Sequence, residues 1–188
     1  QNLQRISKDL ILSNSGEAII INNKGSKGVL LRGYKSEDFS KLKIFNDGIF
    51  LSGKDNLLKN YISIGKELSF TLNINIGDNI TLMSSSGVDT IIGKIPKQKN
   101  FLISSIFESG LADFDNNIAF VNLETLEEFF DFNEKDRNLE VYLDNPKNIE
   151  HQKKIVQDHF PNDFIYSWAD MNSSLFSALK VERNVMFI

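Results

Sequence analysis

The sequence predicts an α+β fold in two subdomains, a strand–helix–strand part and a β-rich insertion. Short apolar runs bounded by turn residues, which are typical of strands, fill the middle of the chain. Towards the C-terminus a strand, a helix, a second strand and a second helix follow one another. The 188 residues are enough for one large domain or two small ones, and a hydrophobic share of 41% can supply a core.

The first predicted elements are short. Residues 17–22 and 28–33 are apolar runs that predict two strands, joined as a hairpin through the turn residues Asn22 to Gly25. The elements predicted after them are a helical turn at residues 38–42, a strand at 61–64, a helix at 65–72, a turn leading into a strand at 76–83, and strands at 101–107 and 118–121.

Asn122 can cap the next predicted helix, because its side chain can accept a hydrogen bond from a free backbone N–H. The apolar stripe of this helix comprises Leu123, Leu126, Phe129 and Phe130. Residues 139–143 alternate and predict a strand with one solvated face. Asn145-Pro146 then begins a helix that ends at Pro161, and residues 164–168 predict another strand. The inner face of this later helix is predicted to contain Ile149, Val156 and Phe160, with Ile155 beside them.

The last residues predict an amphipathic helix that becomes hydrophobic. Asp170 can cap its start, and Leu175, Leu179 and Met186 recur on one face, with Phe176 beside them. The apolar run at residues 185–188 then closes the sequence. One interpretation is that a transmembrane span begins just beyond Ile188. The other is a C-terminal helix that docks on the core, and the pattern alone leaves both open.

Composition narrows the function classes. The net charge of −4 and the pI near 5.3 argue against nucleic-acid binding, which needs a basic surface to neutralise phosphates. The absence of cysteine excludes disulfides and thiol catalysis, and it suits an exported compartment.

Residues able to carry out catalysis are few. His151 and His159 are eight residues apart on one predicted helix, not at the i, i+4 spacing of a zinc site, which favours two surface histidines. Glu108, Asp113 and Asp115 lie in an acidic loop without the ligand series of a calcium site, which favours a solvated turn. Gly87 and Gly93 flank a hairpin-like segment and form no phosphate-binding motif. We therefore expect no catalytic, cofactor-binding or metal-binding residue.

Residues 84–99 form a segment of a different kind, which is too long for a tight turn between its flanking strands. It combines apolar side chains with basic ones, which indicates a contact surface. It is either a protruding hairpin that offers its edge to a partner or an ordinary long hairpin folded back on the domain. The apolar residues are Val88, Ile91, Ile92 and Ile95, and the basic ones are Lys94, Lys97 and Lys99.

Four blocks of the sequence, in order, resemble one known family. They are residues 28–33, residues 64–68 with 77–82, residues 93–98 with 101–110 and Asp115, and residues 175–187. Together they resemble the periplasmic domain of the LolC/LolE permeases of the bacterial lipoprotein-releasing ABC transporter, a MacB-like periplasmic core domain. The last block is the most specific, because in that family it leads straight into the second transmembrane helix. The resemblance therefore favours a transmembrane span beyond Ile188.

The resemblance implies a fold and a location. A porter-like α+β subdomain, expected at residues 1–24 and 135–188, adjoins the membrane, and a β-rich sabre-like insertion is expected at residues 25–134. The domain would lie on the periplasmic face of the inner membrane of a Gram-negative bacterium. The family's first strand is missing here, because residues 1–12 are similar to the tail of the helix that follows that strand.

The resemblance also implies a mechanism without catalysis in this domain. ATP hydrolysis by a separate cytoplasmic subunit drives motion through the membrane helices into this domain. The transporter also contains a second permease subunit, and the sequence leaves open whether the permease is homodimeric or heterodimeric. That motion extracts lipoproteins from the membrane and passes them to the chaperone LolA. In LolC-type permeases a hairpin "hook" captures the chaperone, and it falls on residues 84–96 here. The implied hook residues are Val88, Asp89, Thr90, Ile91, Ile92, Gly93, Lys94, Ile95 and Pro96.

Positions near the hook match the family in part. Gln98 stands where the family has a glutamine, but Thr81 stands where it has an arginine, and Ile91 replaces a proline near the tip. The run Gly93-Lys-Ile-Pro96 favours LolC over LolE. An alternative is a related MacB- or FtsX-like permease that binds an efflux adaptor or a cell-wall hydrolase, which would lack the hook run. An isolated enzyme is a third hypothesis, with no acid–base pair, nucleophile or metal cluster in its favour.

Overall fold

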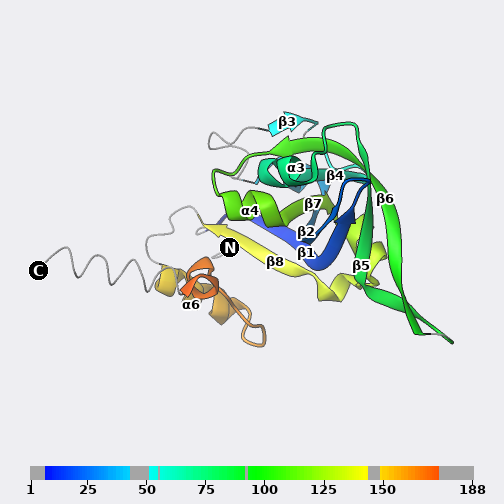
Figure 1. Cartoon of the computed structure of the whole chain (residues 1–188). Coiled ribbons are helices and arrows are strands. Elements are labelled where there is room, and N and C mark those ends of the chain that lie inside the picture. Colours follow the sequence, from blue (N-terminus) through cyan, green and yellow to red (C-terminus); the bar gives the residue numbers. More distant parts are fainter. Residues whose placement is uncertain (1–6, 43–50, 55, 92, 144–148, 174–188) are drawn as a thin grey trace, which may run out of the picture. The chain divides into compact units, whose positions relative to one another are not determined.

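The computed structural model describes residues 7–42, 51–54, 56–91, 93–143 and 149–173. Its chain divides into two units, residues 11–140 and residues 1–10 with 141–188 (Figure 1). Helices and strands are both present, so the α+β fold class is confirmed. We expected boundaries near residues 24 and 134. That division into a porter-like and a sabre-like subdomain stays a prediction; in the larger unit, strand β1 (Ser7–Ile21) pairs with its neighbour strand from Ser13 onward.

Six described strands of the larger unit close into a barrel. Their order is β2 (Ser26–Tyr34), β7 (Ile118–Asn122), β4 (Tyr61–Gly65), β6 (Gly93–Phe107), β5 (Asn79–Thr90) and β1, and β1 pairs with β2 again to complete the ring. Within the ring β2–β7 and β4–β6 are parallel pairs, and the other pairs are antiparallel. Strand β3 (Leu51–Gly53) adds to β6, and β8 (Asn138–Leu143) adds to β1.

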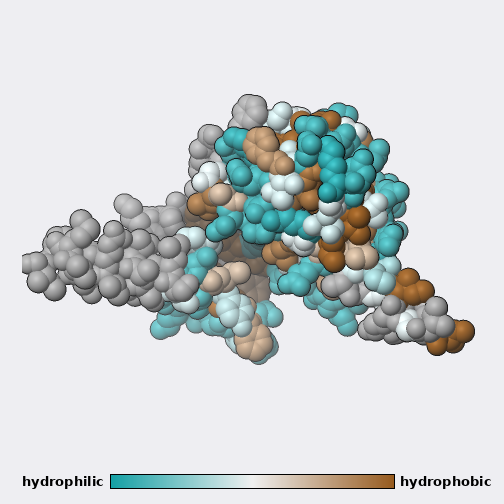
Figure 2. All heavy atoms as spheres, in the orientation of Figure 1, coloured by the Kyte–Doolittle hydropathy of each residue, from teal (hydrophilic) through white to brown (hydrophobic). Residues whose placement is uncertain are grey.

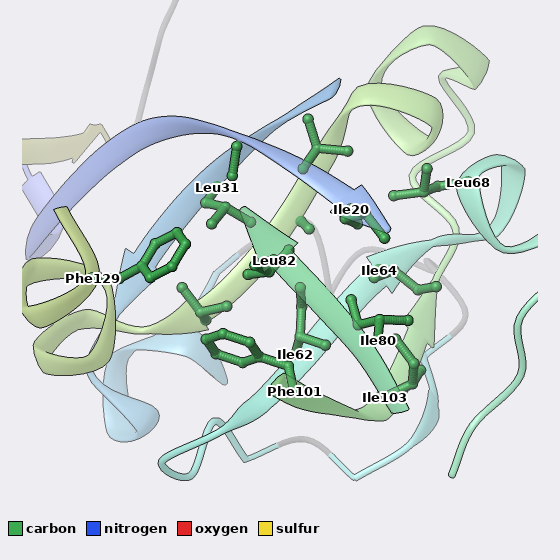
Figure 3. Close-up of a cluster of buried hydrophobic side chains, with 14 of the residues drawn as sticks. Ile20, Leu31, Ile62, Ile64, Leu68, Ile80, Leu82, Phe101, Ile103 and Phe129 are labelled. Atoms are coloured by element: carbon green, nitrogen blue, oxygen red, sulfur yellow. The ribbon is translucent and has the colours of Figure 1, made fainter. Parts of the chain in front are cut away.

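The interior of the barrel is filled by alternate residues of its strands, as the two-residue period of a strand requires. Figure 3 shows these side chains converging from several strands. Their removal from water is the main stabilising contribution to this unit. The buried strand residues are Ala18, Ile20, Val29, Leu31, Ile62, Ile64, Ile80, Leu82, Phe101, Ile103, Ala119 and Val121.

Two short helices contribute to the same core. Helix α5 (Leu123–Phe130) buries Leu126, Phe129 and Phe130 in it, and helix α3 (Lys66–Leu72) buries Leu68 and Leu72. The Oδ1 atom of Asn122 accepts a hydrogen bond of 3.2 Å from the Thr125 N–H, so the predicted cap and apolar stripe of α5 are confirmed.

A second, aromatic cluster surrounds Phe120 of β7. The Phe120 ring centroid lies 5.0 Å from that of Phe107 on β6 and 5.4 Å from that of Phe39 on helix α1 (Ser36–Phe39). Phe114 of helix α4 (Ala112–Asn117) lies 6.4 Å from it, so the cluster fastens both short helices to the barrel. A 3₁₀ turn, η2 (Glu134–Asp136), precedes β8.

The smaller unit contains helices α6 (Ile149–His159) and α7 (Trp168–Met171). Val156 of α6 is buried and Ile149, Ile155 and Phe160 are partly buried, as predicted. The predicted helix start at Asn145-Pro146 and the apolar helix beyond residue 173 lie outside the described residues.

Three predictions for local structure were wrong. Residues 7–12 belong to β1 and are not the tail of a helix. Residues 164–168 are not a strand: the alternation is real, but α7 begins at Trp168. Its N-cap is Ser167 and not Asp170, whose carboxylate completes the capping box from the third helical position.

A candidate partner-binding hairpin

Strands β5 and β6 form a long two-stranded ribbon, not strands joined by a long loop. Their pairing runs from Asn79↔Leu102 to Thr90↔Gly93, which leaves only residues 91 and 92 to connect them. Gly93 has a φ of +117°, a backbone conformation that residues other than glycine rarely adopt. The expectation that this segment is too long for a tight turn was therefore wrong, because most of it continues the two strands.

The ribbon leaves the barrel at Ser84. Strand β5 pairs with β1 as far as Ala18↔Ser84, and beyond it the described pairs of β5 are with β6. At this point the register shifts, so that residues 84–86 lie opposite Lys97 alone. Such bulges bend a strand and are common where a strand changes its surroundings. Figure 1 shows the two strands continuing past the barrel from here.

The end of the ribbon is apolar and exposed. Ile91 is fully exposed and Ile95 is about half exposed, and Figure 2 shows hydrophobic surface at this end. Of the two alternatives left open by the sequence, the structure therefore has the protruding hairpin. The backbone pairs Val88↔Ile95 and Asp89↔Lys94 hold its register, and Ile92 lies outside the described residues.

Thr81 and Gln98 lie on one outward face where the ribbon joins the barrel. Thr81 pairs with Asn100, and Met83 pairs with Gln98, so Thr81 and Gln98 are diagonal neighbours. The Thr81 hydroxyl donates a 2.9 Å hydrogen bond to Asn100 Oδ1. The structure thus brings together the two positions that sequence resemblance singled out beside the hook.

Two lysines at the root of the ribbon form ion pairs with α5 and its C-cap residue. Lys97 Nζ lies 2.5 Å from Asp131 Oδ1, and Lys99 Nζ lies 3.1 Å from Glu128 Oε2. The hydrogen bond from Lys99, with added attraction from Lys59, lowers the pKa of Glu128 below its usual value. An open hollow of about 370 Å³ lies among Lys97, Gln98, Lys99, Glu128 and Phe129. The charge of Lys97 is therefore partly compensated by this domain.

The remaining candidates are structural. His151 and His159 are exposed on α6. We expected Asp115 to lie in a solvated turn, and this was wrong. Asp115 is buried in α4, where its carboxylate accepts a hydrogen bond from the Ser109 N–H at 2.9 and 3.1 Å. The described residues hold no group of three histidine or acidic side chains that could bind a metal ion. Among the described helices, none has the length and apolar character needed to cross a membrane.

Comparison with known proteins identifies relatives of this chain, although no family model matches it. It is 29% identical over 152 residues to the lipoprotein-releasing system transmembrane protein LolC of Xylella fastidiosa, covering 79% of this chain and 35% of that protein. The LolC of Buchnera aphidicola is 33% identical over 132 residues, covering 68% and 32%. The LolC of Neisseria meningitidis is 22% identical over 187 residues, covering 97% and 43%.

The chain is a homologue of LolC. The sequence resemblance to LolC/LolE permeases is thereby confirmed. The chain spans 32% to 43% of the length of these LolC relatives. The periplasmic region of MacB from Actinobacillus actinomycetemcomitans has the same fold, with a TM-score of 0.53 at 11% identity, over 90% of this chain and 76% of that one. The homology to LolC and the fold of a periplasmic region together support a permease's periplasmic domain.

Proposed function

We propose that this chain is the periplasmic domain of a LolC-type permease and that its β5–β6 hairpin captures a LolA-type chaperone. ATP hydrolysis in a separate subunit would cause a movement that the membrane part of the permease transmits to this domain. That motion would release lipoproteins from the inner membrane and hand them to the chaperone. The relatives are named for a lipoprotein-releasing system, which supports lipoproteins as the cargo. The observation that carries the proposal is the protruding hairpin with its exposed apolar end.

The hairpin suits a short-lived contact. Val88, Ile91, Ile92 and Ile95 supply apolar side chains, and Lys94 adds a positive charge that attracts an acidic partner surface. Only the end of the ribbon is exposed and apolar, so the contact area that it offers is small, and small interfaces are typical of transient complexes. A chaperone that must leave with its cargo needs this modest affinity.

This role needs no catalytic residue in the domain. Energy enters at the ATPase subunit and arrives here as a change of conformation. A barrel with a well-packed core is suited to move as a rigid body, because packed interiors have low compressibility. The hairpin, which is built on two barrel strands, would move with it.

Calorimetric titration with purified LolA from the same organism tests the proposal. We expect binding that Ile91→Asp abolishes or weakens at least about tenfold, because a charge would then stand where the complex buries the exposed Ile91 side chain. Deleting residues 85–95 should abolish binding and leave the domain folded. Phe70→Asp, which changes an equally apolar exposed side chain on α3, is the matched control. Unchanged binding in the Ile91→Asp variant would refute the role of the hairpin.

A second candidate is a MacB-like permease domain that binds an efflux adaptor, or an FtsX-like one that binds a cell-wall hydrolase. The shared fold with the periplasmic region of MacB favours it. It predicts that the folded domain does not bind LolA at all. The same titration therefore distinguishes the two functions.

A further inference from the structure

Three exposed aromatic side chains alternate with less exposed residues in the segment that leads from α6 into the first residue of α7. Phe164, Tyr166 and Trp168 are 88%, 70% and 63% exposed. Ile165 is partly buried and Ser167 is buried between them, so exposure alternates along the chain. Met171, one helical turn after Trp168, is 75% exposed. The result is a concentrated apolar and aromatic surface, which we call the aromatic strip (residues 164, 166, 168 and 171).

The aromatic strip is fixed in place by hydrogen bonds within the smaller unit. Gln157 Nε2 of α6 donates to the backbone carbonyls of Phe160 at 3.0 Å and Asp163 at 3.2 Å. Lys153 Nζ of α6 donates to Asp170 Oδ2 at 2.6 Å, and that carboxylate also accepts from the Ser167 N–H and hydroxyl, both at 2.8 Å. Because its backbone is held at both ends, the exposure of the strip reflects defined structure.

We propose that the aromatic strip lies in the interfacial layer of the lipid bilayer beside the permease. Tryptophan and tyrosine favour this layer, because their rings are apolar while the indole N–H and phenol O–H remain hydrated. The LolC relatives are named transmembrane proteins, and more than half of each one lies outside the part matched by this chain. The inference rests on the proposed function, in which the domain is joined to a membrane part.

The chain contains a single tryptophan, which makes Trp168 a direct reporter of this surface. The test uses the 188-residue chain with a C-terminal histidine tag, bound to phosphatidylcholine vesicles that contain a nickel-chelating lipid. The tether raises the local concentration of the domain at the membrane. Trp168 emission is recorded with ordinary lipid, with brominated lipid as a quencher inside the bilayer, and with acrylamide as a quencher in water.

We expect vesicles to shift Trp168 emission to shorter wavelength, brominated lipid to quench it, and acrylamide quenching to fall. Phe164→Ser and Tyr166→Ser should remove most of the brominated-lipid quenching, whereas Phe70→Ser on α3 should leave it unchanged. Absence of quenching, or quenching unaffected by Phe164→Ser, would overturn the proposal. A shift that grows with protein concentration without vesicles would instead show that a second copy covers the strip. Because no chaperone is present, failure here is distinguishable from failure of the hairpin to bind LolA.

Discussion

Glu140 and Arg32 form a partly buried ion pair, with 2.7 Å between Glu140 Oε1 and Arg32 Nη2. The same carboxylate accepts hydrogen bonds from the hydroxyls of Ser13 and of Tyr34, both of which are buried. The Arg32 guanidinium also lies 5.3 Å from the centre of the Tyr34 ring. One side chain of β8 thus connects β8 with β1 and β2 at the last residue of the larger unit.

Glu140→Ala should destabilise the larger unit by about 2–4 kcal/mol, because it removes an ion pair with Arg32 and hydrogen bonds from two buried hydroxyls at once. Urea unfolding of the chain measures the change. Glu134→Ala, at an exposed glutamate of the preceding turn, is the control and should cost about 0.5 kcal/mol or less. Equal effects of the two substitutions would show that the Glu140 network is not stabilising.

Glu127 and Glu128 are neighbours on α5, but their removal should lower the stability of the domain by different amounts. Glu127 is buried and receives two hydrogen bonds from Arg137, Nε to Oε1 at 2.7 Å and Nη2 to Oε2 at 2.8 Å. These contacts raise the pKa of Arg137 above its usual value. Glu127→Ala should cost about 2–3 kcal/mol, and exposed Glu128→Ala less than about 1 kcal/mol. Thermal unfolding of both variants checks this, and a reversed order would contradict it.

Gly65 permits close contact between β4 and α4. A Cβ atom at this position would lie 2.0 Å from the carbonyl oxygen of Asp115, a backbone atom that cannot rotate away. Gly65→Ala should therefore destabilise the domain by about 3 kcal/mol. Gly28→Ala on β2, where a Cβ would meet nothing within 4 Å, should be nearly neutral. Denaturant midpoints of the two variants that coincide would refute this account.

Acid should loosen the smaller unit at a defined pH. The hydrogen bond from Lys153, with those from Ser167, lowers the pKa of Asp170 to about 2 from its ordinary value of 3.8. A lowered pKa in the folded state means that the stabilisation is complete above pH 3.8 and is lost as the pH falls towards 2. Trp168 fluorescence should report a transition in this range, which Asp170→Asn removes and Asp158→Asn retains. An identical transition in the Asp170→Asn variant would exclude Asp170 as its cause.

The proposed binding of a chaperone should strengthen when position 81 receives the arginine that the family resemblance implies there. Thr81→Arg places a positive charge diagonally beside Gln98, on the outward face at the root of the hairpin. We expect LolA affinity to rise about threefold and to become more sensitive to salt. Asn79→Arg, two residues earlier on the same face of β5, adds the same charge farther from the hairpin and serves as the control. An equal gain from both would indicate general attraction and no local contact.

Local patterns in the sequence predicted much of the barrel. The runs at residues 17–22 and 28–33 became the β1–β2 hairpin, and Asn122 with its apolar stripe became the cap and buried face of α5. These signals are local, because they depend on side-chain period and on a capping side chain a few residues away. Closure of the ring could not be read in this way. It depends on parallel pairs such as β2–β7, whose residues are some ninety positions apart.

The mistaken elements have the same physical origin. Residues 164–168 alternate like a strand, but alternation indicates only that one side is buried, and a strand also needs a hydrogen-bonded neighbour. The burial of Asp115 could not be predicted from the acidic loop. Its hydrogen-bond partner is the backbone N–H of Ser109, and a backbone partner has no signature in the sequence. The composition of the hairpin predicted a contact surface, which stays a prediction. The pairing of β5 with β6 that makes it protrude became visible only in the structure.

Strand β1 has a mechanical consequence. It runs unbroken from Ser7 to Ile21. Nine residue pairs join it to β2, and its last four residues also pair with β5. A pull along β1 would load these hydrogen bonds together in shear, whereas a pull across the strand would open them one at a time. The pairing of β1 with β2 and β5 is thus suited to resist a pull along the strand, because no single hydrogen bond would carry the load alone.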